Sequence, residues 1–345
     1  MNEIGKTSET TLELEYTLSI PQPELKSEIP TDECVNKINI EYEGSLVDSK
    51  KRFITGSIDG SIHLYSEDNI KLEEFKNHNL IINCLEICKI DSQFSILASC
   101  SLDYKFNYSI LNNNKINVIH QMTTPYIINS FDFHKINIYK FITATDEGSI
   151  NLFDLTKLTS EYLKMFTSLQ SKNKKKKSEI NTSIDPLVTM KLNTNSILHV
   201  MWKDESNFIT ACDDHSIQQI NIELQKSNTK IMTSYSSIND LDIRQDLVLT
   251  SHDDGSIRIY DTRSGVISSK FLGHSVWASS ACFNPLNSYL IGSTSYDKSF
   301  KLWDLRGNRE LFTINLNSKG YCGKWNGPQT FLIACDENKI KSIEI

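Results

Sequence analysis

The chain has 345 residues, of which 39% are hydrophobic, and its formal net charge at neutral pH is −7. This length accommodates one large β domain or two ordinary domains. The mildly acidic net charge argues against a protein whose whole surface binds nucleic acid. No run reaches the roughly 18 apolar residues of a membrane span. The start, MNEIGKTSETT, has no apolar core of a secretory signal, so the sequence predicts an intracellular protein without membrane contact.

The eight cysteines suit such a compartment as reduced thiols. None forms a C-x-x-C pair, and Cys84 and Cys88 have no nearby histidine or second cysteine pair that would complete a zinc site. Cys212 and Cys335 stand two residues before a turn acid, where other repeats carry serine or threonine. We interpret them as small buried strand residues, and we expect neither a metal site nor a cofactor.

Three segments precede the repeats of this chain. Residues 1–10 are expected to be disordered. Residues 11–20, TLELEYTLSI, alternate apolar and polar side chains, which predicts a half-buried strand. The following PQPELKSEIP is rich in proline and is interpreted as a linker, because proline interrupts the hydrogen-bonded ladder of a sheet.

From Val35 onward one pattern recurs: an alternating strand, a polar gap, an apolar strand, an acidic turn and another apolar strand. The most complete copy is Gly273 to Arg306, with a Gly-His pair, a turn acid and a Trp-Asp dipeptide. Successive turn acids lie 44, 44, 67, 40, 43 and 40 residues apart. Five of these intervals match the roughly 40–45-residue period of WD repeats; a β-sandwich with accidental spacing is the competing interpretation. The acids are Asp59, Asp103, Glu147, Asp214, Asp254, Asp297 and Glu337.

Seven such repeats predict an all-β fold, a seven-bladed WD-repeat β-propeller in which each blade covers the hydrophobic faces of its neighbours. The seventh repeat stops at Ile345 after its third strand. We therefore expect residues 11–20 to act as an N-terminal clasp strand that completes this blade and removes two open edges, so that residues 11–345 form one domain. A hydrogen-bonded network is expected to fix the blade turns. Its candidate members are His274, Asp297, Trp303, Asp59, Asp103 and Asp254.

The 67-residue interval holds some two dozen surplus residues within about 156–184. This insertion includes SKNKKKKSE, whose like charges repel, and it is expected to loop out of the ring. Three interpretations stay open: a tolerated disordered insertion, a nuclear-import signal, and an arm that contacts RNA. The basic residues concerned are Lys174, Lys175, Lys176 and Lys177.

No catalytic motif is found in the sequence. There is no phosphate-binding G-x-x-x-x-G-K, no G-x-S-x-G elbow and no H-E-x-x-H. Each turn acid belongs to a different repeat, which favours a structural role over metal binding or acid–base chemistry. We therefore expect a binding platform and not an enzyme; an enzyme built on a propeller would need polar residues clustered at the mouth of the central channel.

The residue before each turn acid is expected on the upper rim of the ring. Four of these seven residues are aspartates, which are either ordinary turn residues or an acidic sector that receives a basic segment of a partner. Trp277 follows the Gly-His pair near the same rim and is assigned to partner binding. The candidate partner-binding residues are Trp277, Tyr296, Asp146, Asp213, Asp253 and Asp336.

Five stretches occur in a fixed order: TLELEYTLSIPQPEL, RFITGSIDGSIHLYS, TSYSSINDLDI, the sixth repeat from FLGHSVW to KLWDLR, and a closing repeat with GKW and LIACDENKI. Over about residues 11–345 they resemble the WD-repeat subunit of the pescadillo, block-of-proliferation and WD-repeat (PeBoW) complex. The lysine-bearing insertion falls where that family carries a basic insertion. The resemblance implies a scaffold in large (60S) ribosomal subunit assembly and pre-rRNA maturation. It would dock on the propeller of the block-of-proliferation subunit, join pre-60S particles with the pescadillo subunit, and reside in the nucleus, nucleolus and nucleoplasm.

Members of that family also carry an N-terminal ubiquitin-like domain that contacts the AAA ATPase midasin. Only ten residues precede the predicted clasp strand, so we expect this chain to lack that domain and not to bind midasin. An alternative function keeps the fold. The Asp-x-Arg motifs at Asp261–Arg263 and Asp304–Arg306 resemble those by which WD-repeat substrate receptors engage cullin-type ubiquitin ligases. A generic WD-repeat scaffold with another role is a further alternative.

Overall fold

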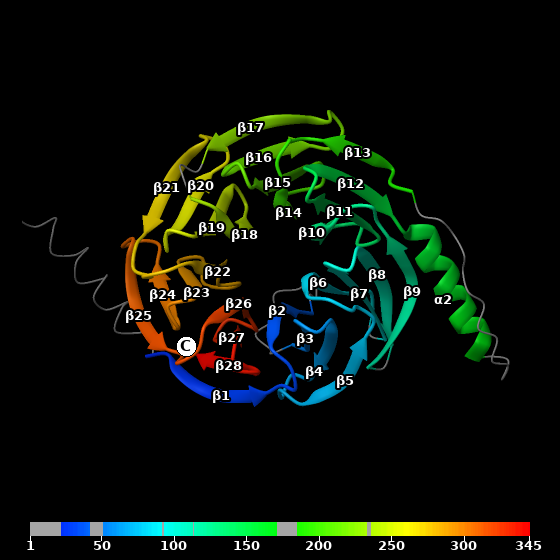
Figure 1. Cartoon of the computed structure of the whole chain (residues 1–345), viewed down its shortest axis with the longest axis horizontal. Helices are drawn as coiled ribbons and strands as arrows, with labels where there is room; N and C mark the ends of the chain where they lie inside the picture. Colours follow the sequence, from blue (N-terminus) through cyan, green and yellow to red (C-terminus); the bar gives the residue numbers. More distant parts are fainter. Residues whose placement is uncertain (1–21, 42–50, 92, 113, 171–184, 233–235) are drawn as a thin grey trace, which may run out of the picture.

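The computed structural model describes residues 22–41, 51–91, 93–112, 114–170, 185–232 and 236–345. Seven four-stranded antiparallel sheets stand as blades around a central axis (Figure 1). The predicted all-β, seven-bladed propeller is confirmed. No helix within the described ranges is long and apolar enough to cross a membrane.

Each of the first three blades runs from the innermost strand outward. Blade 1 contains β2 (Val35–Ile40), β3 (Phe53–Ser57), β4 (Ser61–Tyr65) and β5 (Lys71–Lys76). Blade 2 contains β6 (Ile82–Lys89), β7 (Phe94–Ser101), β8 (Lys105–Asn112) and β9 (Lys115–Thr123). Blade 3 contains β10 (Ile128–Phe133), β11 (Lys140–Thr145), β12 (Ser149–Asp154) and β13 (Val188–Lys191).

The remaining blades repeat this order. Blade 4 contains β14 (Ile197–Trp202), β15 (Asn207–Cys212), β16 (Ser216–Asn221) and β17 (Lys226–Met232). Blade 5 contains β18 (Ile238–Arg244), β19 (Leu247–His252), β20 (Ile257–Asp261) and β21 (Val266–Phe271). Blade 6 contains β22 (Ala278–Phe283), β23 (Leu290–Ser295), β24 (Ser299–Asp304) and β25 (Arg309–Asn315). Blade 7 contains β26 (Gly320–Trp325), β27 (Thr330–Cys335), β28 (Lys339–Glu344) and β1 (Glu24–Pro30).

The ring closes because β1, from the N-terminal part of the chain, pairs antiparallel with β28 near the C-terminus. Ile29 lies opposite Ile340, and Leu25 lies opposite Ile343. The interpretation of PQPELKSEIP as a linker is therefore wrong for Glu24–Pro30. An outermost strand has one unpaired edge, where a residue without an N–H such as Pro30 is tolerated. The predicted clasp strand 11–20 and the predicted disordered residues 1–10 lie outside the described residues.

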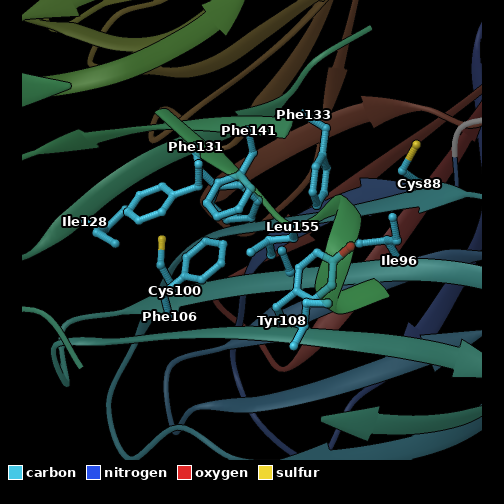
Figure 2. Close-up of a cluster of buried hydrophobic side chains, with 13 residues drawn as sticks. Cys88, Ile96, Cys100, Phe106, Tyr108, Ile128, Phe131, Phe133, Phe141 and Leu155 are labelled. Carbon is cyan, nitrogen blue, oxygen red and sulfur yellow. The ribbon is translucent and has the colours of Figure 1, made fainter. Parts of the chain in front are cut away.

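The core consists of hydrophobic clusters between neighbouring blades, as alternating strand residues from two sheets interdigitate. Figure 2 shows the cluster between blades 2 and 3, which is rich in aromatic rings. The Phe106 and Phe141 rings stack with centroids 4.8 Å apart, and Phe131 meets Phe106 edge-on at 5.1 Å. Burial of each ring contributes about 1.5–3 kcal/mol to stability before the entropy cost, so these interfaces hold the blades together.

The insertion lies within blade 3, between β12 and its outermost strand β13. It begins with a helix, α2 (Thr156–Gln170), which lies on the outer side of the ring (Figure 1). The Asp154 carboxylate accepts a 2.9 Å hydrogen bond from the Thr156 N–H at the start of the helix. Leu158 is buried, and the hydroxyls of Thr159 and Tyr108 lie 2.9 Å apart, which anchors the first turns on blade 2. The expectation that the whole insertion loops out is therefore wrong for residues 156–170. Lys174, Lys175, Lys176 and Lys177 lie outside the described residues.

Candidate interaction surface

The sixth blade holds the most complete polar network of the described chain. His274 Nδ1 lies 2.9 Å from the Asp297 carboxylate, and its Nε2 lies 2.8 Å from Ser293 Oγ. The Trp303 indole N–H donates to the same Ser293 oxygen at 2.8 Å. Burial opposes ionisation of Asp297, but hydrogen bonds from His274 and Ser299 outweigh it and hold the pKa of this carboxyl well below its ordinary value. The network ties the entry loop, the turn and two strands to one another.

The other predicted network acids lie at equivalent turns with simpler partners. Asp103 faces His78 Nδ1 at 3.1 Å in blade 2, where His78 Nε2 also reaches a serine. Asp59 and Asp254 each accept hydrogen bonds from the backbone N–H and hydroxyl of the serine two residues later. Burial opposes their ionisation, but it is outweighed at Asp59 by hydrogen bonds from Lys76 and Ser61 and at Asp254 by those from Ser256 with the charge of Arg258, so that the pKa of both carboxyls is lowered to about 2. Asp59 also receives a lysine ammonium and Asp254 an arginine guanidinium.

The seven residues that precede the turn acids lie on one face of the ring, which we call the upper rim. In each blade the backbone N–H of this residue bonds to a carbonyl in the loop before the inner strand, as in Ile58 to Cys34 at 3.0 Å and Tyr296 to Trp277 at 3.0 Å. Five further residues make the equivalent bond: Leu102, Asp146, Asp213, Asp253 and Asp336. The structure therefore places Asp146, Asp213 and Asp253 on consecutive blades of one rim.

These aspartates differ in how their carboxylates are used. Asp146 accepts a 3.0 Å bond from the Ile127 N–H, and Asp336 accepts one of the same length from the Lys319 N–H, so both brace their own loops. Asp213 is exposed and Asp253 is half-buried. A solvated turn role thus accounts for part of the acidic sector, and its role toward a partner stays a prediction.

An aromatic rim patch, formed by Trp277, Tyr296, Tyr321 and Lys319, lies on blades 6 and 7. The Trp277 ring is 52% exposed and lies 5.7 Å from the Tyr296 ring, which in turn meets Tyr321 edge-on at 5.5 Å. The Lys319 ammonium lies 5.7 Å from the Tyr296 ring centroid. The sequence analysis missed Tyr321 and Lys319. Tyr321 occupies an inner-strand position that is asparagine or serine in most repeats, and this departure is the signal that identifies it.

The two Asp-x-Arg motifs pair internally. Arg263 lies 3.2 Å from Asp261, and Arg306 lies 2.9 Å from Asp304. The Arg306 guanidinium also stacks 4.8 Å above the Tyr289 ring. These contacts within each blade explain the motif without a partner, so the motif gives the ubiquitin-ligase alternative no independent support.

A second set of residues that sequence reasoning missed joins neighbouring blades around the inner strands. The side-chain amide of Asn36 donates to the Ile82 carbonyl of the next blade at 2.6 Å, and Asn239 donates to the Ala278 carbonyl at 2.9 Å. The equivalent bonds are made by Asn83, Asn129 and Ser279. The signal was present as an Ile-Asn or Val-Asn dipeptide at the start of four inner strands. Within the described ranges, no group of three or more His, Cys, Asp or Glu side chains is arranged to hold a metal ion.

Comparison with known proteins agrees with this geometry. The WD domain, G-beta repeat family matches residues 265–304, which lie in blades 5 and 6. The chain is similar to ribosome biogenesis proteins. It is 24% identical over 360 residues to the ribosome biogenesis protein WDR12 homolog of Drosophila pseudoobscura pseudoobscura. This alignment covers 99% of this chain and 79% of the Drosophila protein. The ribosome biogenesis protein WDR12 homolog of Anopheles gambiae is 24% identical over 353 residues, and the alignment covers 96% of this chain and 76% of the Anopheles protein. The similarity to these WDR12 homologs thus extends across all seven blades.

Proposed function

We propose that this protein is a non-catalytic interaction scaffold in large (60S) ribosomal subunit assembly and pre-rRNA maturation. The structural observation that carries the proposal is the aromatic rim patch, which a rigid ring of seven blades presents to solvent. The near full-length similarity to proteins named for ribosome biogenesis directs the proposal to this process and to the nucleus, nucleolus and nucleoplasm.

The rim patch has the properties of a docking site. Exposed tryptophan and tyrosine are the residue types that dominate binding energy at protein interfaces. Val276, adjacent to Trp277, is also exposed, at 44%. The backbone bond from Tyr296 to Trp277 holds this loop in place before any partner arrives, so little ordering entropy is lost on binding. The aspartates on blades 3, 4 and 5 add a negative sector that attracts a basic partner surface.

The partners proposed for this rim are a block-of-proliferation-type propeller and, through it, a pescadillo-type factor on pre-60S particles. The resemblance of the repeats to the PeBoW subunit supports this assignment. A stable docking contact of this kind buries on the order of 1,200–2,000 Å² in total, which requires several blades of the rim and not the aromatic patch alone. Contact with RNA through Lys174 to Lys177 remains a prediction.

Purification of the tagged protein from nuclear extract, followed by mass spectrometry, tests the proposal. We expect block-of-proliferation-type and pescadillo-type factors together with large-subunit ribosomal proteins, and sedimentation with pre-60S particles. Association with cullin adaptors, and absence from every pre-60S fraction, would instead support the ubiquitin-ligase alternative.

A further inference from the structure

The lower face of the ring, opposite the upper rim, contains a cavity of about 370 Å³. Its walls come from inner strands β2, β6, β10, β14 and β18 and from the turn after β10. Sites of roughly 300–1,000 Å³ with mostly apolar walls and a few convergent polar groups are typical of ligand binding. The apolar wall is formed by Ile40, Ile87, Phe133, Ile138, Met201 and Ile243.

Three carboxyl groups converge on this cavity from blades 2, 3 and 5: Glu86, Asp132 and Asp242. Each is held in place by a backbone N–H of the next blade. Glu86 accepts from Phe133 at 3.3 Å, Asp132 from Trp202, and Asp242 from Phe283 at 2.8 Å. Because these bonds fix the carboxyls to the blade framework, their arrangement does not depend on a bound ligand.

The cationic groups near the cavity do not balance these three acids. Lys135 also lines it, but its ammonium donates to the Lys203 carbonyl on blade 4 at 3.2 Å. His134 lies beside it and bonds to the Glu205 carbonyl. The Lys324 ammonium also attracts all three acids, and the Arg244 guanidinium attracts Asp242. Burial, reinforced by the charge of Asp132, raises the pKa of Glu86 well above its ordinary value, and burial also raises the pKa of Asp132 to about 7 and that of Asp242.

Asp240, in the layer of inner-strand residues directly above, differs from these three acids. Asp240 faces Lys324, His199 and Lys37 there. Burial opposes its ionisation, but the charge of Lys324 prevails and lowers the pKa of the Asp240 carboxyl. In the same layer, burial lowers the pKa of His199 to about 4. The charge of Lys324 therefore outweighs burial at Asp240, whereas burial outweighs it at the three lower acids, which line the cavity.

We propose that the lower cavity binds an alkylammonium group, with the ammonium among Glu86, Asp132 and Asp242 and the aliphatic stem along the apolar wall. Long cationic side chains place their methylene groups on apolar surface and keep the charged end among polar groups in this manner. Two sources carry this chemistry: a lysine side chain of a partner protein and a free polyamine. The inference does not rest on the proposed function of the upper rim.

Isothermal titration of the full chain at low salt tests this inference with two probes, spermidine and a short lysine peptide blocked at both ends. The matched control probe is the same peptide with an acetylated lysine, which keeps the stem and removes the charge. We expect at least one charged probe to bind, and the acetylated peptide to bind at least tenfold more weakly. Tighter binding of spermidine would identify a polyamine as the source, and tighter binding of the peptide would identify a lysine side chain.

Three variants locate the binding in the cavity. Glu86→Gln and Asp242→Asn keep the side-chain shapes and are each expected to weaken the charged probe at least fivefold. Ile138→Arg places a competing cation in the wall of the cavity. It is expected to weaken binding of the charged probe to a similar extent, although no carboxyl group is removed. Asp213→Asn, on the upper rim, is the matched control and should change affinity less than twofold. Absence of binding by both probes at millimolar concentration, or binding that none of the three cavity variants weakens, would overturn the inference.

Discussion

Ser293 is the side chain on which the polar network of blade 6 converges. Its oxygen accepts the Trp303 indole N–H, and its hydroxyl donates to His274 Nε2 when His274 Nδ1 donates to the Asp297 carboxylate. Donors and acceptors therefore alternate along the whole path. Such a chain satisfies groups that would each cost about 1–3 kcal/mol if they were buried without a partner.

Substitution of Trp303 tests this network and the core beneath it. Trp303→Ala is expected to lower the free energy of unfolding by about 3–5 kcal/mol, because it leaves a cavity and removes one of the two hydrogen bonds of Ser293. Trp303→Phe retains most of the ring volume and should cost about 1–3 kcal/mol. Chemical denaturation at equilibrium measures both. Trp277→Ala is the control, since this half-exposed ring should cost less than about 1 kcal/mol. Equal losses at the two tryptophans would contradict the assignment.

Asp132 predicts a pH dependence with a definite sign. Its folded-state pKa of about 7 lies above the ordinary value of 3.8, so the folded protein binds more protons than the unfolded chain between these values. The stability that Asp132 contributes is therefore present at low pH and declines as pH rises toward 7.

Asp132→Asn removes this titration while its amide oxygen still accepts from the Trp202 N–H. The free energy of unfolding of the variant, relative to the parent, is expected to increase by about 2–3 kcal/mol between pH 5 and pH 8. Denaturant titrations of both proteins across this range measure the difference. A relative stability that is constant with pH would show that Asp132 is already ionised in the folded protein.

The residues predicted most directly from the sequence are those whose chemistry is local. A turn acid and the serine two residues later are separated by a fixed distance along the chain, so repeat spacing places Asp59 and Asp254 at their turns. Tyr321 and Asn36 could not be assigned in this way. Their contacts are with residues on neighbouring blades, and these depend on the rotation between sheets, which a single repeat does not encode.

At the scale of single elements, β1 shows why an outermost strand is hard to recognise in the sequence. Ile29 is 8% exposed, whereas Leu25 is 40% exposed. An outermost strand covers little surface, so it lacks the alternation by which strands are recognised. Helix α2 was missed for a related reason. Its anchoring contacts, Leu158 and Thr159, fall in the first turns, next to a lysine-rich segment that favours the interpretation as a loop.

Substitutions in β1 test the ring closure. Ile29→Asp places a charge in the cluster between blades 7 and 1 and is expected to destabilise the fold by about 3 kcal/mol or more. Leu25→Asp is the matched control on the same strand, and it should change stability by less than about 1 kcal/mol. Thermal and denaturant unfolding of both variants provide the comparison. A tolerated Ile29→Asp would mean that β1 contributes little to the closure of the ring.

At the scale of the whole molecule, one ring presents two chemically different ends. The upper rim carries the exposed aromatic patch on blades 6 and 7 and aspartates on blades 3, 4 and 5, whereas the lower end holds the cavity with its three carboxyls. The amide bonds from Asn36, Asn83, Asn129 and Asn239 link successive inner strands, so both ends are held on one framework. A partner at the rim and an alkylammonium group at the lower cavity therefore occupy separate sites.

The final prediction separates two contributions of the rim to docking on a block-of-proliferation-type propeller. Trp277→Ala is expected to weaken the complex at least tenfold, mainly through faster dissociation, because it removes a buried anchor of the interface. Leu286→Ala is the matched control. This residue is similarly exposed, at 44%, and belongs to the same blade, but it lies in the turn between β22 and β23 at the opposite face. The pair Asp213→Asn and Asp253→Asn should instead slow association and reduce its dependence on salt, because exposed charges steer the encounter more than they hold the complex. Surface plasmon resonance at two ionic strengths distinguishes these effects. If Leu286→Ala weakens binding as much as Trp277→Ala, the docking face is not the upper rim.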